Sequence, residues 1–237
     1  MSRPDLGLSV PLLDEAGSVD GLLSDLRAAT DAAGIRLRVA LVDNGSTDGT
    51  GARIDALAAA DPAGVVAVHL AENAGYGGGI LAGLRALRAV DPPPVLGWAW
   101  GDRQVAPSVL PALYGACRAG APLAKARRVE RQDGPQRVLV TATYGAVMRA
   151  LGVVTPDVNG CPKLFRAEAL EALALRSTDW FIDAEAVLGA EARGWQIADA
   201  PVIMRPRAAG RSKVRVATVV EFARNLLGRR RRGLTRS

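Results

Sequence analysis

The sequence has few residues of the kinds that bind soft metals or act as catalytic nucleophiles. It contains two cysteines, Cys117 and Cys161, and one histidine, His69. Two cysteines do not make a disulfide framework, and they lack the close spacing of zinc ligands. A single histidine also argues against a zinc centre or a Ser-His-Asp triad. Any metal is therefore expected to have oxygen ligands, which suits Mg²⁺ or Mn²⁺.

Long apolar runs are also missing, although 49% of the 237 residues are hydrophobic. No run reaches the ~18 residues of a membrane span, and the N-terminal segment lacks the apolar stretch of a signal peptide. We therefore expect a cytoplasmic protein with one large domain. Aromatic residues make up only 4% and are not interleaved with the basic residues. Base stacking thus has little support, and we expect no nucleic-acid partner.

Positive charge is concentrated at the C-terminal end. Residues 205–237 carry 11 Lys and Arg and one acid, a net charge of +10, whereas residues 1–204 carry 19 Lys and Arg and 23 acids, a net charge of −4. We divide the chain into a domain, 1–215, and a basic amphipathic helix and tail, 216–237. The tail suits an anionic partner such as the inner face of a membrane, which it would contact peripherally. A solvated terminus is the alternative.

Apolar segments of strand length alternate with segments of helical spacing. Strands are expected at 8–13, 38–43, 65–70, 95–100 and 123–126. Helices are expected at 18–33, 80–90, 136–151, 166–176, 183–193 and 216–228. A further helix is expected to begin close to Asp48, its N-cap, and the helix at 183–193 is expected to end at Gly194. The alternation predicts βαβ units. The fold class is therefore α/β, with a Rossmann-like, mostly parallel central sheet flanked by helices in a single domain.

Two loops rich in small residues follow predicted strands. In LVDNGSTDGT, 41–50, Asp43 ends a strand and can accept a hydrogen bond from a base or sugar, while the turn exposes backbone N–H groups near a helix start. In NAGYGGG, 73–79, four of seven residues are glycine, which favours close backbone approach or positive φ. The alternative for each is a turn without a ligand. A dehydrogenase is not expected, because the glycine pattern follows the third strand and lacks the acid about 20 residues later.

The stretch WGDRQ, 100–104, offers oxygen ligands at the end of the fourth strand. Asp102 and Gln104 suit Mg²⁺ or Mn²⁺ if a diphosphate supplies further ligands. The alternative is a surface loop. A basic group follows, whose arginine forks suit phosphate oxygens unless they are simply solvated. Its members are Lys125, Arg127, Arg128, Arg131 and Arg137.

Two acids stand at a helix start in WFIDAE, 180–185. Asp183 and Glu185 are candidates for a general base, or for an N-cap with its helix acid. Of the two, we expect Asp183 to face a ligand.

Taken in order, these motifs resemble family-2 glycosyltransferases of the GT-A fold, especially the polyprenyl-phosphate sugar synthases (the dolichol-phosphate mannose synthase group). The resemblance covers roughly residues 8–215. It is carried by LSVPLLDEAGSV, LVDNGSTDGT, NAGYGGGILAGL, DVNGCPKLFRAEAL, WFIDAEAVLGAEARGWQIADAPVIM and RPRAAGRSKV. The family's metal motif, Asp-x-Asp-x-Gln, falls on WGDRQ, so Trp100 stands where the family has its first acid.

The resemblance also implies roles for individual residues. Asp43 would bind the nucleotide base, assisted by Glu15, while Asp102 and Gln104 would hold Mg²⁺ or Mn²⁺. Arg127 and Arg137 would bind the acceptor phosphate, and Asp183 would be the general base. The residues expected along the donor nucleotide are Pro11, Glu15, Asp43, Asn44, Gly45, Asn73, Gly77 and Asp102.

The implied function is inverting transfer of one sugar from a UDP- or GDP-type nucleotide sugar, in cell-envelope or natural-product biosynthesis. The Gln-x-x-Arg-Trp motif of processive synthases is absent, which favours a single transfer. The acceptor is either a polyprenyl phosphate or a soluble small molecule. The alternative function is a non-catalytic nucleotide-sugar-binding module with a degenerate metal site.

Overall fold

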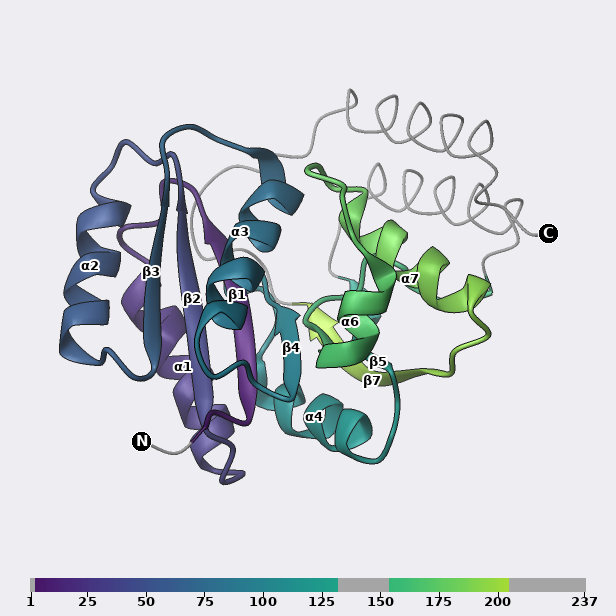
Figure 1. The fold of residues 1–237 in the computed structure, drawn as a ribbon. Coiled ribbons are helices and arrows are strands. Elements are labelled where there is room, and N and C mark those ends of the chain that lie inside the picture. The colour runs from purple at the N-terminus through teal and green to yellow at the C-terminus, as the bar shows by residue number, and fades with distance from the viewer. Residues whose placement is uncertain (1–2, 132–153, 205–237) are drawn as a thin grey trace.

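The computed structural model describes residues 3–131 and 154–204. Within these ranges it has one seven-stranded sheet in the order β3-β2-β1-β4-β6-β5-β7 (Figure 1). The strands are β1 Leu6–Leu12, β2 Leu37–Asn44, β3 Val65–Leu70, β4 Val95–Trp98, β5 Leu123–Arg131, β6 Lys163–Arg166 and β7 Ile197–Met204. The helices are α1 Val19–Asp31, α2 Thr50–Ala60, α3 Gly75–Ala89, η1 Pro107–Val109, α4 Leu110–Arg118, α6 Ala167–Leu173 and α7 Ile182–Ala192. Arg137 and the helices predicted at 136–151 and 216–228 lie outside the described residues.

The first four strands are parallel and are joined by helices, which confirms the predicted βαβ units. β6 runs antiparallel between β4 and β5, and β7 pairs parallel with β5 at the edge. The sheet is therefore mostly parallel, as predicted for an α/β fold. None of the helices in the described ranges is long and apolar enough to cross a bilayer.

Helices cover both faces of the sheet because its strand side chains alternate between two cores. Val39 and Leu41 of β2 belong to the core that contains buried residues of α1, α2 and α4, whereas Ala40 between them belongs to the core that contains buried residues of α3, α6 and α7. β4 follows the same rule, with Val95 on the first face and Leu96 on the second. Burial on both faces explains why these strands read as continuous apolar runs in the sequence.

Three details of the prediction differ from the structure. The helix expected from residue 80 begins at Gly75, inside the glycine-rich stretch. The helix expected to be capped by Asp48 has Gly49 as N-cap, with φ of 93°, and Asp48 instead accepts a hydrogen bond from the Thr50 N–H at 3.0 Å. Two strands, β6 and β7, were not predicted. Both are short or partly exposed, so their apolar pattern is weak.

Candidate active site

The carboxyl ends of β1, β2 and β4 lie next to one another (Figure 1). Strand order reverses between β1 and β4, and open α/β sheets bind ligands outside the carboxyl ends at such a point. Pro11 and Asp43 stand at the ends of β1 and β2. Beyond β4, Gly101 packs so closely on Leu12 that a Cβ there would lie 2.5 Å from that side chain. The structure thus brings together three of the segments selected from the sequence.

The loops after β1 and β2 are joined by hydrogen bonds. A carboxylate oxygen of Asp14 accepts from the Thr47 N–H at 2.9 Å, and the Glu15 N–H donates to Thr50 Oγ1 at 2.9 Å. The carboxylate of Glu15 accepts from Ser18 Oγ at 2.8 Å. Glu15 is therefore held beside the β2 loop, where its predicted role as a partner of Asp43 requires it.

Asp43 is anchored by its own turn and by a histidine that the sequence analysis did not place in the site. Its Oδ1 accepts from the Ser46 N–H at 2.9 Å, and its side chain is 14% exposed. His69 pairs with Asp43 in the β2–β3 register, and its Nδ1 lies 3.7 Å from Asp43 Oδ2. The other ring nitrogen, Nε2, lies 2.8 Å from Asp55 Oδ1. The strand register was the only signal that could have found this contact.

Hydrogen bonds and one close backbone contact join the end of β2 to the loop after β3, through Asn44, Gly45 and Asn73. The side-chain amide of Asn44 donates to Asn73 Oδ1 at 3.2 Å and to the Gly75 carbonyl at 3.0 Å. Asn44 Oδ1 accepts from the Ala74 N–H at 3.0 Å. Gly45 has φ of 77°, and a Cβ there would lie 2.7 Å from the Asn73 nitrogen. These contacts place the start of α3.

The glycine-rich stretch is packed against the chain itself. A Cβ on Gly77 would lie 2.2 Å from the Ser177 carbonyl oxygen. The Gly78 N–H donates to the Thr178 carbonyl at 2.9 Å. The close backbone approach that the glycines allow is therefore made by residues 177–179. Contact of Gly77 with a donor nucleotide stays a prediction.

The exit from β4 forms a tight turn. Asp102 Oδ1 accepts from the Gln104 N–H at 3.2 Å, and Gln104 is buried. Arg103 between them has φ of 56° and donates to Asp25 Oδ2 of α1 at 2.9 and 2.7 Å. The guanidinium of Arg103 is thus directed to α1 and neutralised there.

A divalent metal is compatible with this turn. In the described ranges no group of three or more His, Cys, Asp or Glu could hold a metal by itself. Asp102 and Gln104 supply a carboxylate and an amide, and Mg²⁺ is commonly held by one or two carboxylates with phosphate oxygens and water. The oxygen donors present therefore fit a metal whose remaining ligands come from a bound diphosphate.

The arginines of β5 form ion pairs. Arg127 Nε donates to Asp199 Oδ1 at 2.9 Å, and both side chains are partly exposed. Arg128 binds Asp157 through its backbone N–H at 2.8 Å and through its guanidinium, which also lies 5.4 Å from the centroid of the Trp100 ring. Trp100, at the position of the expected acid, is thus packed against a cation–carboxylate pair.

Asp183 lies in a buried ion pair beneath the site. Its Oδ1 accepts from Lys163 Nζ at 2.6 Å and from Trp98 Nε1 at 3.1 Å. The side chain of Asp183 is 3% exposed and that of Lys163 is 0% exposed. Glu185 is also buried and accepts from the Ser177 N–H at 2.8 Å. Both acids therefore hold neighbouring segments in place.

Lys125 and Lys163 are paired in the β5–β6 register, and nothing in the sequence pattern indicated that they are buried. Lys125 Nζ donates to the carbonyls of Pro156 and Asp157 at 2.7 and 3.2 Å. Burial lowers the pKa of Lys125 to about 8. The two lysines tie the segment that precedes β6 to the sheet.

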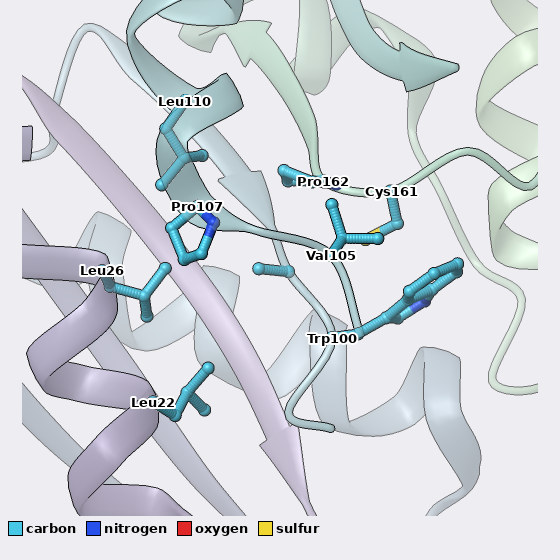
Figure 2. Close-up of a pocket in the computed structure, with 9 residues that line it drawn as sticks. Leu22, Leu26, Trp100, Val105, Pro107, Leu110, Cys161 and Pro162 are labelled. Atoms are coloured by element: carbon cyan, nitrogen blue, oxygen red, sulfur yellow. The ribbon is translucent and has the colours of Figure 1, made fainter. Parts of the chain in front are cut away.

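A small apolar hollow lies between α1 and Trp100 (Figure 2). Its walls include Leu22 and Leu26 of α1, Val105, and Cys161. Burial raises the pKa of the Cys161 thiol well above its ordinary value. The hollow offers no charged side chain, so it does not suit a diphosphate.

Comparisons with known proteins agree with the fold and the order of the motifs. A family model described as glycosyl transferase family 2 matches residues 9–174. A polyprenol monophosphomannose synthase of Mycolicibacterium smegmatis is 32% identical over 198 residues, covering 78% of this chain and 73% of that protein. An undecaprenyl-phosphate 4-deoxy-4-formamido-L-arabinose transferase of Pseudomonas aeruginosa is 33% identical over 73% of this chain. This chain spans about half the length of that second relative, which is covered to 50%.

Solved structures share the fold at lower sequence identity. A glucosyl-3-phosphoglycerate synthase from Mycobacterium tuberculosis, in complex with Mn²⁺, UDP and glucosyl-3-phosphoglycerate, has a TM-score of 0.67 at 21% identity, over 95% of this chain and 80% of that one. A mannosyltransferase from Pyrobaculum calidifontis, in complex with GDP-Man and Mn²⁺, has a TM-score of 0.61 at 21% identity, over 90% of this chain and 59% of that one.

Proposed function

The chain belongs to glycosyltransferase family 2 and has the GT-A fold, and we propose that it transfers one sugar, with inversion, from a UDP- or GDP-sugar to a polyprenyl phosphate. Sugar transfer is the chemistry of the family. The acceptor, the donor nucleotide and the roles of individual residues are the proposed part.

The choice of a phosphate acceptor rests on the position of Asp183. A hydroxyl acceptor must lose a proton as it attacks, which calls for a general base in contact with it. Asp183 is the base candidate from the sequence, but its carboxylate is 3% exposed and is occupied by Lys163. A phosphate monoester needs no such base, because its second pKa is about 6 and it is already ionised at neutral pH. Asp183 as base stays a prediction for a hydroxyl acceptor only.

The similar proteins favour the same acceptor class. The names of the relatives from Mycolicibacterium smegmatis and Pseudomonas aeruginosa both refer to a polyprenol or undecaprenyl phosphate product or substrate. Neither the family match nor these relatives support the alternative of a non-catalytic binding module. Membrane contact through the basic tail, 216–237, would bring the enzyme to a lipid acceptor and is part of the proposal.

In the proposed reaction, an acceptor phosphate oxygen forms a bond to C1 of the sugar as the bond from C1 to the donor diphosphate breaks. The electron pair leaves with the nucleoside diphosphate. Asp43, supported by Glu15, accepts a hydrogen bond from the base, and Arg127 with Arg137 binds the acceptor phosphate. A divalent metal held by Asp102 and Gln104 would supply positive charge to the departing diphosphate. Arg127 would exchange its partner Asp199 for the acceptor phosphate.

The proposal is tested by comparing two acceptors that differ only in the phosphate. The purified chain is incubated with labelled UDP-glucose or GDP-mannose and with undecaprenyl phosphate or undecaprenol in detergent, each with Mn²⁺ or with EDTA. We expect Mn²⁺-dependent transfer to undecaprenyl phosphate and no transfer to undecaprenol. Equal transfer to undecaprenol would contradict the proposed acceptor.

A further inference from the structure

The loop before α7 is fixed against the first turn of α3. Cβ atoms on Gly75 and Gly77 would lie 2.4 and 2.2 Å from the carbonyl oxygens of Thr178 and Ser177, so only glycine allows this contact. Glu185 holds the same loop from the other side by accepting the Ser177 N–H. The residue that follows this anchored loop is Trp180, and its position is set by these contacts.

Trp180 stacks on Tyr76 of α3. The ring centroids are 4.3 Å apart and the planes differ by 16°. The Tyr76 hydroxyl is buried, and that burial raises its pKa well above the ordinary value. Trp180 itself is 36% exposed. Among the large hydrophobic residues that are exposed in the described ranges, it is the aromatic one. The stack covers one face of the indole with a buried ring, so the indole is held rigidly while part of it contacts solvent.

Tyr76 also lies close to the turn predicted to bind the diphosphate. The Tyr76 hydroxyl lies beside Trp100 and Cys161, although neither it nor Trp100 Nε1 makes a hydrogen bond of good geometry. Trp100 stands two residues before Asp102. Tyr76 therefore connects Trp180, on which its ring stacks, to Trp100 at the exit of β4, which lies beside its hydroxyl.

We propose that Trp180 is the platform on which the sugar ring of the nucleotide-sugar donor stacks, which makes it a specificity-determining residue. This inference rests on the proposed function, because it needs a donor diphosphate at Asp102. The sugar is joined directly to that diphosphate, so it must lie within one ring of it. The C–H face of a pyranose is apolar, and a rigid indole can cover it at little cost in side-chain entropy.

The platform should act on the sugar and not on the nucleotide. UDP and GDP lack the ring that would stack, and their predicted contacts lie at Asp43 and Asp102. A loss of stacking should therefore weaken binding of the nucleotide sugar while leaving binding of the nucleoside diphosphate unchanged. A residue that only stabilised the fold would affect both ligands equally.

The test is calorimetric binding of UDP-glucose, GDP-mannose, UDP and GDP, with Mn²⁺, to the full chain and to three variants. Trp180→Ala removes the platform, Trp180→Phe keeps a ring, and Trp195→Ala is the control. The Trp195 ring lies 5.6 Å from the Arg193 guanidinium and precedes β7, which is an edge strand of the sheet. We expect Trp180→Ala to bind the nucleotide sugar about tenfold more weakly than wild type. Trp180→Phe should lose about threefold or less, and Trp195→Ala should match wild type.

The outcomes separate this inference from the proposed function. If wild type binds a nucleotide sugar and Trp180→Ala binds it equally well, the platform is wrong and the glycosyltransferase function is untouched. Equal weakening of nucleotide sugar and nucleoside diphosphate would also overturn the platform. If wild type binds no nucleotide sugar, the proposed function itself fails, and the inference fails with it.

Discussion

Replacing Gly77 with alanine is expected to destabilise the fold by wedging α3 away from the loop before α7. The new Cβ would lie 2.2 Å from the Ser177 carbonyl oxygen and 2.8 Å from that of Asp179. Both are backbone atoms held in place, so no side chain can move to make room. The hydrogen bond from the Gly78 N–H to Thr178, at 2.9 Å, would be broken or stretched.

The expected magnitude follows from three terms. Forcing an extra carbon into a packed contact costs about 1–3 kcal/mol, and losing the Gly78 hydrogen bond costs about 1 kcal/mol. Alanine's better helix propensity offsets about 1 kcal/mol of this. The net loss in the free energy of unfolding is therefore about 1–3 kcal/mol, or a fall in Tm of about 3–10 °C.

Gly115→Ala is the matched control, because Gly115 lies inside α4 with nothing within 4 Å of a Cβ. This variant should be more stable than wild type by about 0.5–1 kcal/mol. Urea unfolding followed by circular dichroism measures both variants. A Gly77→Ala protein as stable as wild type, alongside the expected gain in Gly115→Ala, would refute the close packing of α3 on residues 177–179.

Three further predictions concern charges. Lys163→Met should destabilise the fold by about 3–5 kcal/mol, because it leaves the Asp183 carboxylate buried without its cation. The control is Arg88→Ala, which breaks an exposed ion pair and should change the free energy of unfolding in urea by under about 1 kcal/mol. Asp102→Asn should lower Mn²⁺-stimulated transfer about 100-fold while leaving UDP or GDP binding in EDTA unchanged, and full activity would exclude Asp102 from the metal site. The pKa of Lys125 is lowered to about 8, so between pH 8 and about 10.4 the unfolded chain binds more protons than the folded one and the contribution of Lys125 to stability rises with pH. Lys125→Met should lack this rise in urea unfolding at pH 7.5 and 10, and a pH-independent difference from wild type would contradict the assignment.

The sequence predicted the parts of the fold that depend on local pattern. The run at 65–70 is apolar except for His69 and is a strand with those bounds. Gly194 follows Arg193, the C-cap of α7, and has φ of 67°, as expected for that position. By contrast, the start of α3 was missed because glycine has poor helix propensity. Gly77 lies inside α3 despite this low propensity. A residue with a side chain would not fit there, because the helix contacts the Ser177 carbonyl at that point.

The sequence predicted the positions of site residues that lie at strand ends, but not the partners that these residues contact. Asp43 lies at the end of β2 and Asp102 follows β4, and these two strands flank β1, so the parallel order implied by the βαβ pattern brings both acids to the same edge of the sheet. The partners of Asp183 and Asp43 were not visible in the sequence, because both contacts are tertiary: Lys163 of β6 reaches Asp183 on α7, and His69 of β3 pairs with Asp43 of β2. Charge spacing along a chain does not show which lysine is buried opposite which acid.

The most direct test of the proposed reaction is the structure of its product. The chain is given a nucleotide sugar of known anomeric configuration together with undecaprenyl phosphate, and the lipid product is analysed by mass spectrometry and ³¹P and ¹H NMR. We predict a sugar joined through C1 to the lipid phosphate as a phosphodiester, with the anomer opposite to that of the donor. A sugar on a hydroxyl group, retained configuration, or no lipid-linked sugar would contradict inverting transfer to an ionised phosphate.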